Sequence, residues 1–367
     1  MKRLSLLKNG TALALGLATT VALAGAEDEG ALYTMDNGAG GNHVLAFHRQ
    51  ENGRFLSSGT FSTGGTGAGA GLSSQGAIAL SQDGHWLFVC NAGSSDISVL
   101  AVTRNGLWLT DKVSSGGRMP VSLALRHDLL YVANAGGGSG DKDNITAFIF
   151  AAGKLLALPH STRELSGDNT GPAQVSFSSD GNSLIVTERL TNLIDTYAVA
   201  DDGLARKHQL FQSVGTTPFG FDVGRQDRVF VSEAVTGSVS SYVLSEDGEL
   251  HVVSGAVPTH QMAACWVLAS HDERFIYTAN AASGSISGFQ VGRDGSLQLL
   301  DADGRTAVIG DGSHPVDMAQ SQDGRFVYNL ANGDGTLHGF RVRENGSLEP
   351  IGVIKGIPPS ASGLAAR

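Results

Sequence analysis

The stretch GSISGFQVGRDGSLQLL, residues 284–300, returns in altered form as DGTLHGFRVRENGSLEPI at residues 334–351. Each copy has an alternating run of apolar and polar residues, a turn containing Asp-Gly or Asn-Gly, and a second run. These pairs favour tight hairpin turns, because Asn, Asp and Gly tolerate the positive φ angles that such turns require. Each copy therefore predicts a β-hairpin.

Five further copies of this phrase precede the two at the C-terminal end. They begin near residues 42, 95, 143, 192 and 237. The turn glycines of the seven copies are Gly53, Gly106, Gly153, Gly203, Gly248, Gly295 and Gly346, and the gaps between neighbours range from 45 to 53 residues. A period of this length is typical of a propeller or a solenoid.

A second hairpin comes before each phrase, as in GAIALSQDGHWLFVCN at residues 76–91. Two hairpins give four short antiparallel strands per repeat, which is the blade of a β-propeller. The chain has 50 glycines and only 16% charged residues, as expected for many tight turns between short strands. No stretch has sustained helical spacing of apolar residues, so the sequence predicts an all-β, seven-bladed β-propeller with four antiparallel strands per blade.

The ends of the repeat pattern predict how the ring closes. The first repeat starts at LYTMDN, residues 32–37, which matches the second strand of the other blades. Its missing innermost strand resembles the tail PPSASGLAAR, residues 358–367. We expect this C-terminal strand to complete blade 1. Cys90 and Cys265 then fall in blades 2 and 6, too far apart for a disulfide, and are expected to be two buried thiols.

The first 26 residues have the pattern of a secretory signal peptide. Three basic residues precede an apolar run, and AGA at residues 24–26 supplies small residues for cleavage. The run is too short and too alanine-rich to favour a membrane span. We expect a signal peptide at 1–26, one propeller domain at 27–367, and an exported protein, either periplasmic or secreted.

The charge of the chain limits its partners. The net charge is −10, and removal of the first 26 residues would make it −13. An acidic protein is a poor partner for DNA or anionic lipid. We expect no nucleic-acid partner and no membrane span after cleavage.

The repeated SQDGHWLFVCNAGSSDISVLAVTRNG, SQDGRFVYNLANGDGTLHGFRV and GPAQVSFSSDG resemble the seven-bladed lactonase family over nearly the whole mature chain. That family includes bacterial 6-phosphogluconolactonase and fungal 3-carboxy-cis,cis-muconate cyclase. The resemblance implies a His, an Arg and a Glu around the central channel, in segments similar to HPHS, GPRH and NEL.

This chain departs from all three segments. It has MPVS at residues 119–122, GPAQ at 171–174 and ERL at 188–190. Glu188 stands one position before the expected Glu, and Arg189 takes that position. A lactone hydrolase needs a group that activates water or protonates the ring oxygen, and a donor for the developing oxyanion. Glu188 and Arg189 are therefore the candidate catalytic pair, with altered geometry.

Other candidates lie where the loops of a propeller converge on one face around the channel. The candidate ligand-binding residues are Arg118, Gln174, Glu233, His260, Trp266, His314 and Asp317. In the functional interpretation His and Asp transfer protons and Trp266 stacks on a sugar-like ring. In the alternative, Trp266 packs between blades, Asp317 caps a turn and both histidines are solvated.

The glycine-rich TGGTGAGAGLSS, residues 63–74, has no Gly-Lys-Ser/Thr ending and opens no helix, so it does not predict a phosphate-binding loop. We expect a flexible connection into blade 2 that lies over the channel mouth. The eleven histidines include no close pair at metal-ligand spacing. The sequence therefore predicts neither a metal site nor a cofactor.

Two functions remain open from the sequence. One is an exported lactonase-like propeller that binds or hydrolyses a small sugar-acid lactone or a related carboxylate, as a lactonase or a cycloisomerase-like enzyme. The other is a non-catalytic exported scaffold whose rim loops bind a protein or a glycan. Loss of the usual His and Arg favours the scaffold, and the cluster of ionisable and aromatic residues on one rim favours the lactonase.

Overall fold

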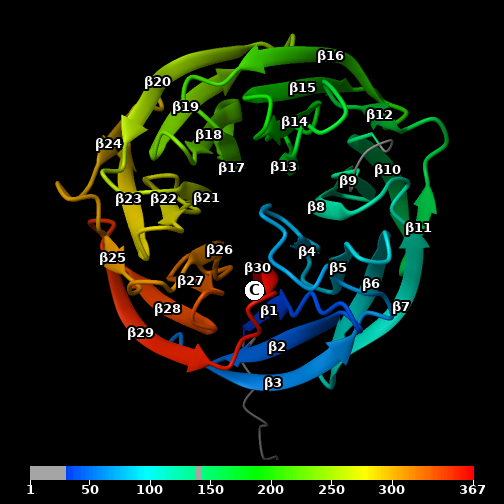
Figure 1. Ribbon diagram of the computed structural model, residues 1–367, viewed down its shortest axis with the longest axis horizontal. Coiled ribbons are helices and arrows are strands. Elements are labelled where there is room, and N and C mark those ends of the chain that lie inside the picture. Colours follow the sequence, from blue (N-terminus) through cyan, green and yellow to red (C-terminus); the bar gives the residue numbers. More distant parts are fainter. Residues whose placement is uncertain (1–29, 137–141) are drawn as a thin grey trace, which may run out of the picture.

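The computed structural model describes residues 30–136 and 142–367. Seven antiparallel sheets are arranged as a ring around a central axis (Figure 1). Each sheet contains four strands, which follow sequence order from the axis outward except that the last strand of the chain is innermost in blade 1. Two sheets carry one short extra strand. The predicted seven-bladed β-propeller is confirmed. The signal peptide predicted at 1–26 lies outside the described residues.

Each blade has an innermost, a second, a third and an outermost strand, and these are equivalent in all seven blades. The innermost strands, from blade 1 to blade 7, are β30 (Ser362–Ala366), β4 (Ile78–Leu80), β8 (Pro120–Arg126), β13 (Pro172–Phe177), β17 (Pro218–Val223), β21 (Ala264–Ala269) and β26 (Pro315–Gln320). The second strands are β1 (Ala31–Met35), β5 (Trp86–Asn91), β9 (Leu129–Asn134), β14 (Ser183–Glu188), β18 (Arg228–Glu233), β22 (Phe275–Asn280) and β27 (Phe326–Ala331).

The outer half of each blade is the repeated hairpin of the sequence. The third strands are β2 (His43–Arg49), β6 (Asp96–Thr103), β10 (Asn144–Ala151), β15 (Leu193–Val199), β19 (Ser238–Leu244), β23 (Ser285–Val291) and β28 (Thr336–Val342). The outermost strands are β3 (Phe55–Ser62), β7 (Gly106–Ser114), β11 (Lys154–Ala157), β16 (Ala205–Gln212), β20 (Leu250–Pro258), β24 (Leu297–Leu299) and β29 (Leu348–Lys355). The remaining elements are β12 (Arg163–Glu164), β25 (Ala307–Val308) and the short 3-10 helix η1 (Arg225–Asp227).

The repeated turn glycines form hydrogen bonds between neighbouring blades. Their carbonyl oxygens accept hydrogen bonds from Tyr or Thr hydroxyls of the preceding blade at five of the seven positions. The pairs are Thr110 with Gly153, Tyr131 with Gly203, Thr196 with Gly248, Tyr277 with Gly346, and Tyr328 with Gly53, at 2.7–2.9 Å. The turn glycines also have positive φ angles, which suit a residue without Cβ. The phrase recurs because each blade must present the same turn to its neighbour.

The two ends of the described chain meet in blade 1. Strand β30 pairs antiparallel with β1, with Tyr33 opposite Ala365. Beyond the strands, Ala31 and Arg367 exchange backbone hydrogen bonds of 3.3 and 2.9 Å. The predicted closure by the C-terminal strand is confirmed. The predicted absence of a disulfide is also confirmed, since Cys90 on β5 and Cys265 on β21 are free, buried thiols. Among the described residues no helix has the length and apolar character needed to cross a bilayer.

Deletion of residues 360–367 is expected to lower the thermal midpoint of unfolding by many degrees. The deletion removes β30 and leaves β1 with an unpaired edge and the ring open. Differential scanning calorimetry of the truncated and full-length proteins measures the effect. A truncated protein with an unchanged midpoint would show that the ring does not depend on this strand.

Candidate functional site

The antiparallel order of the strands gives the ring two different faces. One face carries the loops that lead into the innermost strands and the loops that join second to third strands, and we call it the loop face. The other carries the hairpin turns that join innermost to second strands, and we call it the hairpin face. All nine candidate residues from the sequence lie on the loop face or on innermost strands below it.

The connection between blades 1 and 2 fills the axis of the ring at the loop face. Figure 1 shows this segment, next to β4, reaching toward the centre. Its bonds to innermost strands of other blades are Leu72 N to Ser362 Oγ (3.2 Å), Ser74 Oγ to Val121 O (2.8 Å), Gln75 N to Ala173 O (2.9 Å) and Trp266 Nε1 to Ser74 O (3.0 Å). The connection therefore fastens the blades to one another, beyond lying over the channel mouth as the sequence predicts.

Gln75 occupies a place that other blades fill with a residue of their own. Ser122 Oγ of blade 3 accepts a hydrogen bond from Val175 N of blade 4, and Gln174 Oε1 of blade 4 accepts one from Phe221 N of blade 5. Blade 5 has Gly220 at the corresponding position.

The amide of Gln75 supplies the bonds that Gly220 cannot make. Its Oε1 accepts from Val267 N (2.9 Å), and its Nε2 donates to Val267 O (2.8 Å) and Phe221 O (3.3 Å). A Cβ atom on Gly220 would lie 2.2 Å from Gln75 Oε1. The glycine therefore makes room for a side chain that arrives from a distant blade.

Glu188 ends β14 and is fully buried. Its Oε1 accepts from Ser166 N (2.8 Å), and its Oε2 accepts from Ser166 Oγ and from Thr191 Oγ1 (2.5 Å). Behind it on β15, burial raises the pKa of Asp195 to about 7, while the His208 ring, at 3.1 Å, acts in the opposite direction. Ser166 lies in the connection from blade 3 and Thr191 lies in blade 4, so both oxygens of the Glu188 carboxylate are held within the protein.

Arg189 follows Glu188, and its backbone N–H donates to Gly171 O (3.2 Å). Its guanidinium has no hydrogen-bond or ion-pair partner among residues 30–136 and 142–367, and its Nε is buried without an acceptor. Burial lowers the pKa of Arg189, while Cys265 of blade 6 and Asp143 of blade 3 act in the opposite direction. The guanidinium is therefore within electrostatic reach of two other blades, and it is a partly desolvated cation near the axis.

Three further candidates have structural contacts. Glu233 is fully buried and accepts from Ser238 Oγ (2.7 Å), and burial raises its pKa. Gln174 is buried in the bond between blades 4 and 5 described above. Trp266 is 5% exposed, and its ring packs on Phe219 with 4.9 Å between centroids. The Trp266 ring therefore offers little surface for stacking on a ligand.

The remaining loop-face candidates are exposed. Arg118 and His260 lie in the loops before β8 and β21, and His314 lies before β26. The Nδ1 atom of His314 lies 2.9 Å from Asn332 Oδ1. The Nδ2 atom of Asn332 donates to Ala361 O (3.3 Å), so the Oδ1 atom of Asn332 faces the His314 imidazole. This arrangement assigns the Nδ1–H tautomer to neutral His314 and leaves a lone pair on Nε2.

Asp317 on β26 is buried beside the closing strand. Its Oδ2 accepts a hydrogen bond from Gly363 N at 2.8 Å, and the Gly76 backbone also donates to this carboxyl. Burial raises the pKa of Asp317 to about 7. Asp317 therefore joins blade 7 to blade 1 and to the start of blade 2. Among the described residues, no group of three or more His, Cys, Asp or Glu is arranged to hold a metal ion.

Comparison with known proteins identifies the family. The family described as Lactonase, 7-bladed beta-propeller matches residues 27–152, 144–233 and 224–356. The chain belongs to this family. The resemblance expected from the repeat segments is confirmed. No match was found among curated protein sequences.

Solved structures of family-like propellers share the fold at low identity. A periplasmic gluconolactonase from Pseudomonas aeruginosa has a TM-score of 0.74 and 18% identity, over 91% of this chain and 99% of that chain. A candidate 6-phosphogluconolactonase from Bacteroides fragilis has a TM-score of 0.74 and 18% identity, over 93% and 98%. A protein from Lactobacillus plantarum has a TM-score of 0.76 and 16% identity, over 92% and 99%. At these identities the likeness establishes the fold alone.

Sequence reasoning missed two residues that shape this family member's loop face. Gln75 was not singled out, although Gly220 is a visible exception to the polar residues at Ser122 and Gln174. Asn332, which orients His314, lies far from it in sequence and carries no motif. The Gln75 bonds exist only once distant blades are brought together, and the contact of Asn332 with His314 exists only once β27 folds back beside β26.

Substitution of Gln75 by Ala is expected to cost about 1–3 kcal/mol in free energy of unfolding, because the buried Val267 N–H loses its acceptor. Gly220→Ala is expected to destabilise the protein as well, and by less when Gln75 is already Ala, because one of its clashes is then gone. Urea unfolding of the two single variants and the double variant measures the coupling. Strictly additive free energies would contradict direct contact between the two positions.

The Asp317→Asn variant is expected to lose part of the pH dependence of stability between about pH 4 and pH 7. The pKa of Asp317 is about 7 in the folded protein, above its ordinary value of 3.8, so the folded state holds the proton more tightly. This contribution is complete below the unfolded pKa and is lost as pH rises through about 7. Thermal midpoints should therefore converge below about pH 4, with the variant more stable at pH 8. Parallel curves at all pH values would refute the assignment.

Proposed function

We propose that this protein is an exported lactonase that opens a small, uncharged sugar-acid lactone at the loop face. The family supplies the reaction class, and the observation that carries the site is the unpartnered guanidinium of Arg189 near the ring axis. A cation held partly out of water is suited to the negative charge that develops on a lactone carbonyl oxygen. Arg189 also stands at the position of the Glu that the family resemblance leads one to expect.

Glu188 supports Arg189 without taking part in proton transfer. Its carboxylate accepts bonds from Ser166 and Thr191 and is sealed from solvent. A general acid or base must reach the proton that it transfers. Glu188 therefore fixes the end of β14, from which the Arg189 backbone continues.

His314 is the loop-face group best suited to take a proton from the attacking water. His314 is exposed, and its Nδ1 atom is bonded to Asn332, which leaves the Nε2 lone pair on the opposite side of the imidazole unused. Hydrolysis of a lactone forms a bond from water oxygen to the carbonyl carbon and breaks the ring ester bond. The proton taken by His314 can then be returned to the departing ring oxygen.

An uncharged substrate fits this site better than a phosphorylated one. A phosphate group is usually held by several basic side chains. The buried carboxyls of Glu188 and Glu233 lie on the same face, and the whole chain has a net charge of −10. Export is consistent with this choice, since phosphorylated sugar intermediates are mostly intracellular.

Arg189→Ala is expected to lower kcat/KM for lactone hydrolysis by about a hundredfold or more, the usual effect of removing one oxyanion donor. A pH-stat assay of residues 27–367 with glucono-1,5-lactone, galactono-1,4-lactone and 6-phosphogluconolactone measures acid release above the spontaneous rate. Arg206→Ala is the matched control, because Arg206 lies on the outermost strand of the same blade and pairs only with exposed Asp202.

Each result of this assay decides one part of the proposal. Equal loss in both variants, or no loss in Arg189→Ala, would remove Arg189 from the reaction. Faster hydrolysis of the phosphorylated lactone would overturn the substrate class. A folded protein that hydrolyses none of the three would overturn the lactonase proposal and leave the non-catalytic scaffold, for which the occupied carboxylates of Glu188 and Glu233 are the structural argument.

A further inference from the structure

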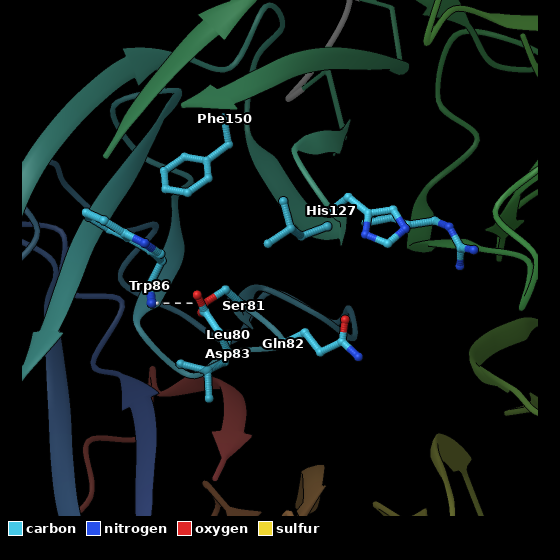
Figure 2. A pocket seen from close by; sticks show the side chains of 9 residues that line it. Leu80, Ser81, Gln82, Asp83, Trp86, His127 and Phe150 are labelled. Carbon is cyan, nitrogen blue, oxygen red and sulfur yellow. Dashed lines mark hydrogen bonds between the residues drawn. The ribbon is translucent and has the colours of Figure 1, made fainter. Parts of the chain in front are cut away.

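The hairpin face carries two adjoining cavities, on the opposite side of the ring from the proposed lactone site. The larger, of about 800 Å³, lies between blades 2 and 3 and is shown in Figure 2. The smaller, of about 380 Å³, lies where the innermost strands of blades 2 to 5 end. Both are lined by Leu80, Leu125 and Arg126, so they adjoin each other, and we call the two together the hairpin-face groove.

The groove exists because blade 3 has an unusually short turn. Two residues, His127 and Asp128, separate its innermost and second strands, whereas four or five residues do so in blades 2, 4, 5, 6 and 7. His127 has a φ of 53°, in a turn position that normally favours glycine. The short turn leaves open the space that a longer hairpin would cover, and it places an imidazole at the edge of this space.

Two aromatic rings form one wall of the larger cavity. Trp86 of β5 and Phe150 of β10 are half-buried, with 5.2 Å between ring centroids and an angle of 67°. Phe150 is supported from behind by Phe88 at 4.9 Å, and a Cβ atom on Gly153 would lie 2.8 Å from the Trp86 ring. Each ring is thus packed against the neighbouring blade while lining the cavity.

Uncommitted polar groups lie across from the aromatic wall. Gln82 and His127 are exposed, and neither makes a hydrogen bond with the part of the chain that the structure describes. Figure 2 shows Trp86 and Phe150 on one side of the opening and His127 and Gln82 on the other. The groove therefore offers an apolar surface facing free donors and acceptors.

The charged groups of the groove are already used by the protein. Arg126 donates to the carbonyl oxygens of Ser179 (2.9 Å) and Asp180 (2.5 Å). The Asp83 carboxylate accepts from Ser81 Oγ (2.5 Å), and this bond, with the His85 backbone, lowers the pKa of Asp83. The smaller cavity adds Asp222, whose carboxylate accepts from Ala269 N (2.8 Å) and Val223 N (2.9 Å). Each of these charged side chains is bonded within the protein, so the groove favours an uncharged ligand.

We propose that the hairpin-face groove binds a neutral saccharide. A sugar ring presents C–H groups on one face, which can pack on Trp86 and Phe150, and hydroxyl groups at its edge, which can bond to Gln82 and His127. The two cavities, of about 800 and 380 Å³, extend from the interface of blades 2 and 3 to the innermost strands of blades 4 and 5, and their volume suits more than one sugar ring. This site is separate from the proposed lactone site, and it holds the protein on a carbohydrate without chemical reaction.

Isothermal titration of residues 27–367 with maltotetraose, cellotetraose and tetra-N-acetylchitotetraose tests the proposal, with trigalacturonate as the anionic comparison. At least one neutral tetrasaccharide is expected to bind saturably with a Kd on the order of 1 mM or tighter, and trigalacturonate more weakly. Absence of saturable binding by all three neutral sugars up to about 10 mM would overturn the proposal, as would preferred binding of trigalacturonate.

The double variant Gln82→Ala, His127→Gly is expected to weaken binding by about tenfold or more, since two sets of hydrogen bonds are lost. Its fold is protected because glycine suits the positive φ at residue 127. Trp108→Ala is the control for non-specific stacking, because Trp108 is 72% exposed on an outermost strand. Arg189→Ala is the control for the loop face.

Both controls are expected to bind as the unmodified protein does, whether or not Arg189→Ala abolishes lactone hydrolysis. Binding lost in Arg189→Ala and kept in the double variant would place the sugar on the loop face and overturn the groove proposal. Binding lost in Trp108→Ala would place it on the outer edge, with the same consequence.

Discussion

The side-chain amide of Gln75 joins the innermost strands of blades 5 and 6 from a segment that belongs to neither blade. It comes from the connection between blades 1 and 2 and bonds to Phe221 of blade 5 and Val267 of blade 6. A propeller has few contacts between blades that are not neighbours, and a buried backbone N–H without an acceptor is costly. Blade 5 can keep Gly220 only because Gln75 enters its place. The filled loop-face end of the axis follows from this insertion, whereas the ring is closed by the pairing of β30 with β1.

Filling the axis changes what the loop face can do. Trp266 is covered because its indole N–H donates to Ser74 of the same connection. Glu188 and Glu233 are fully buried, and their carboxylates are hydrogen-bonded within the protein. These buried residues therefore support the structure, and the candidates left accessible to a ligand are Arg118, Arg189, His260 and His314. A catalytic site on this face must rely on fewer groups than the family resemblance implies, in a different arrangement.

The loop face and the hairpin face differ in the charge of the groups that they offer to a ligand. The loop face has a partly desolvated cation beside buried carboxyls, which suits a developing negative charge. The hairpin face has aromatic rings and neutral polar groups, with its charges paired inside turns. One alternation of strands produces both faces, because loops and hairpin turns emerge at opposite ends of each blade. The faces can therefore serve different ligands without sharing a residue.

The sequence by itself determined the fold. Alternating strands and turn glycines at 45–53-residue spacing are local features, and seven copies of them leave one way to bury the blade faces. The displaced start of the first repeat and the matching tail were enough to predict ring closure. The candidate residues were also placed on the correct elements, since strand order decides at which end of a blade each loop emerges.

Only the tertiary structure decided what those residues do. Whether Glu188 faces a ligand or the protein interior depends on Ser166 and Thr191, and the tautomer of His314 depends on Asn332. The cover over Trp266 and the groove beside His127 arise between blades that are distant in sequence. A repeat pattern encodes the contacts within a blade and between similar neighbours. Contacts that break the repeat have no periodic signal, because their partners are set by how the ring brings dissimilar segments together.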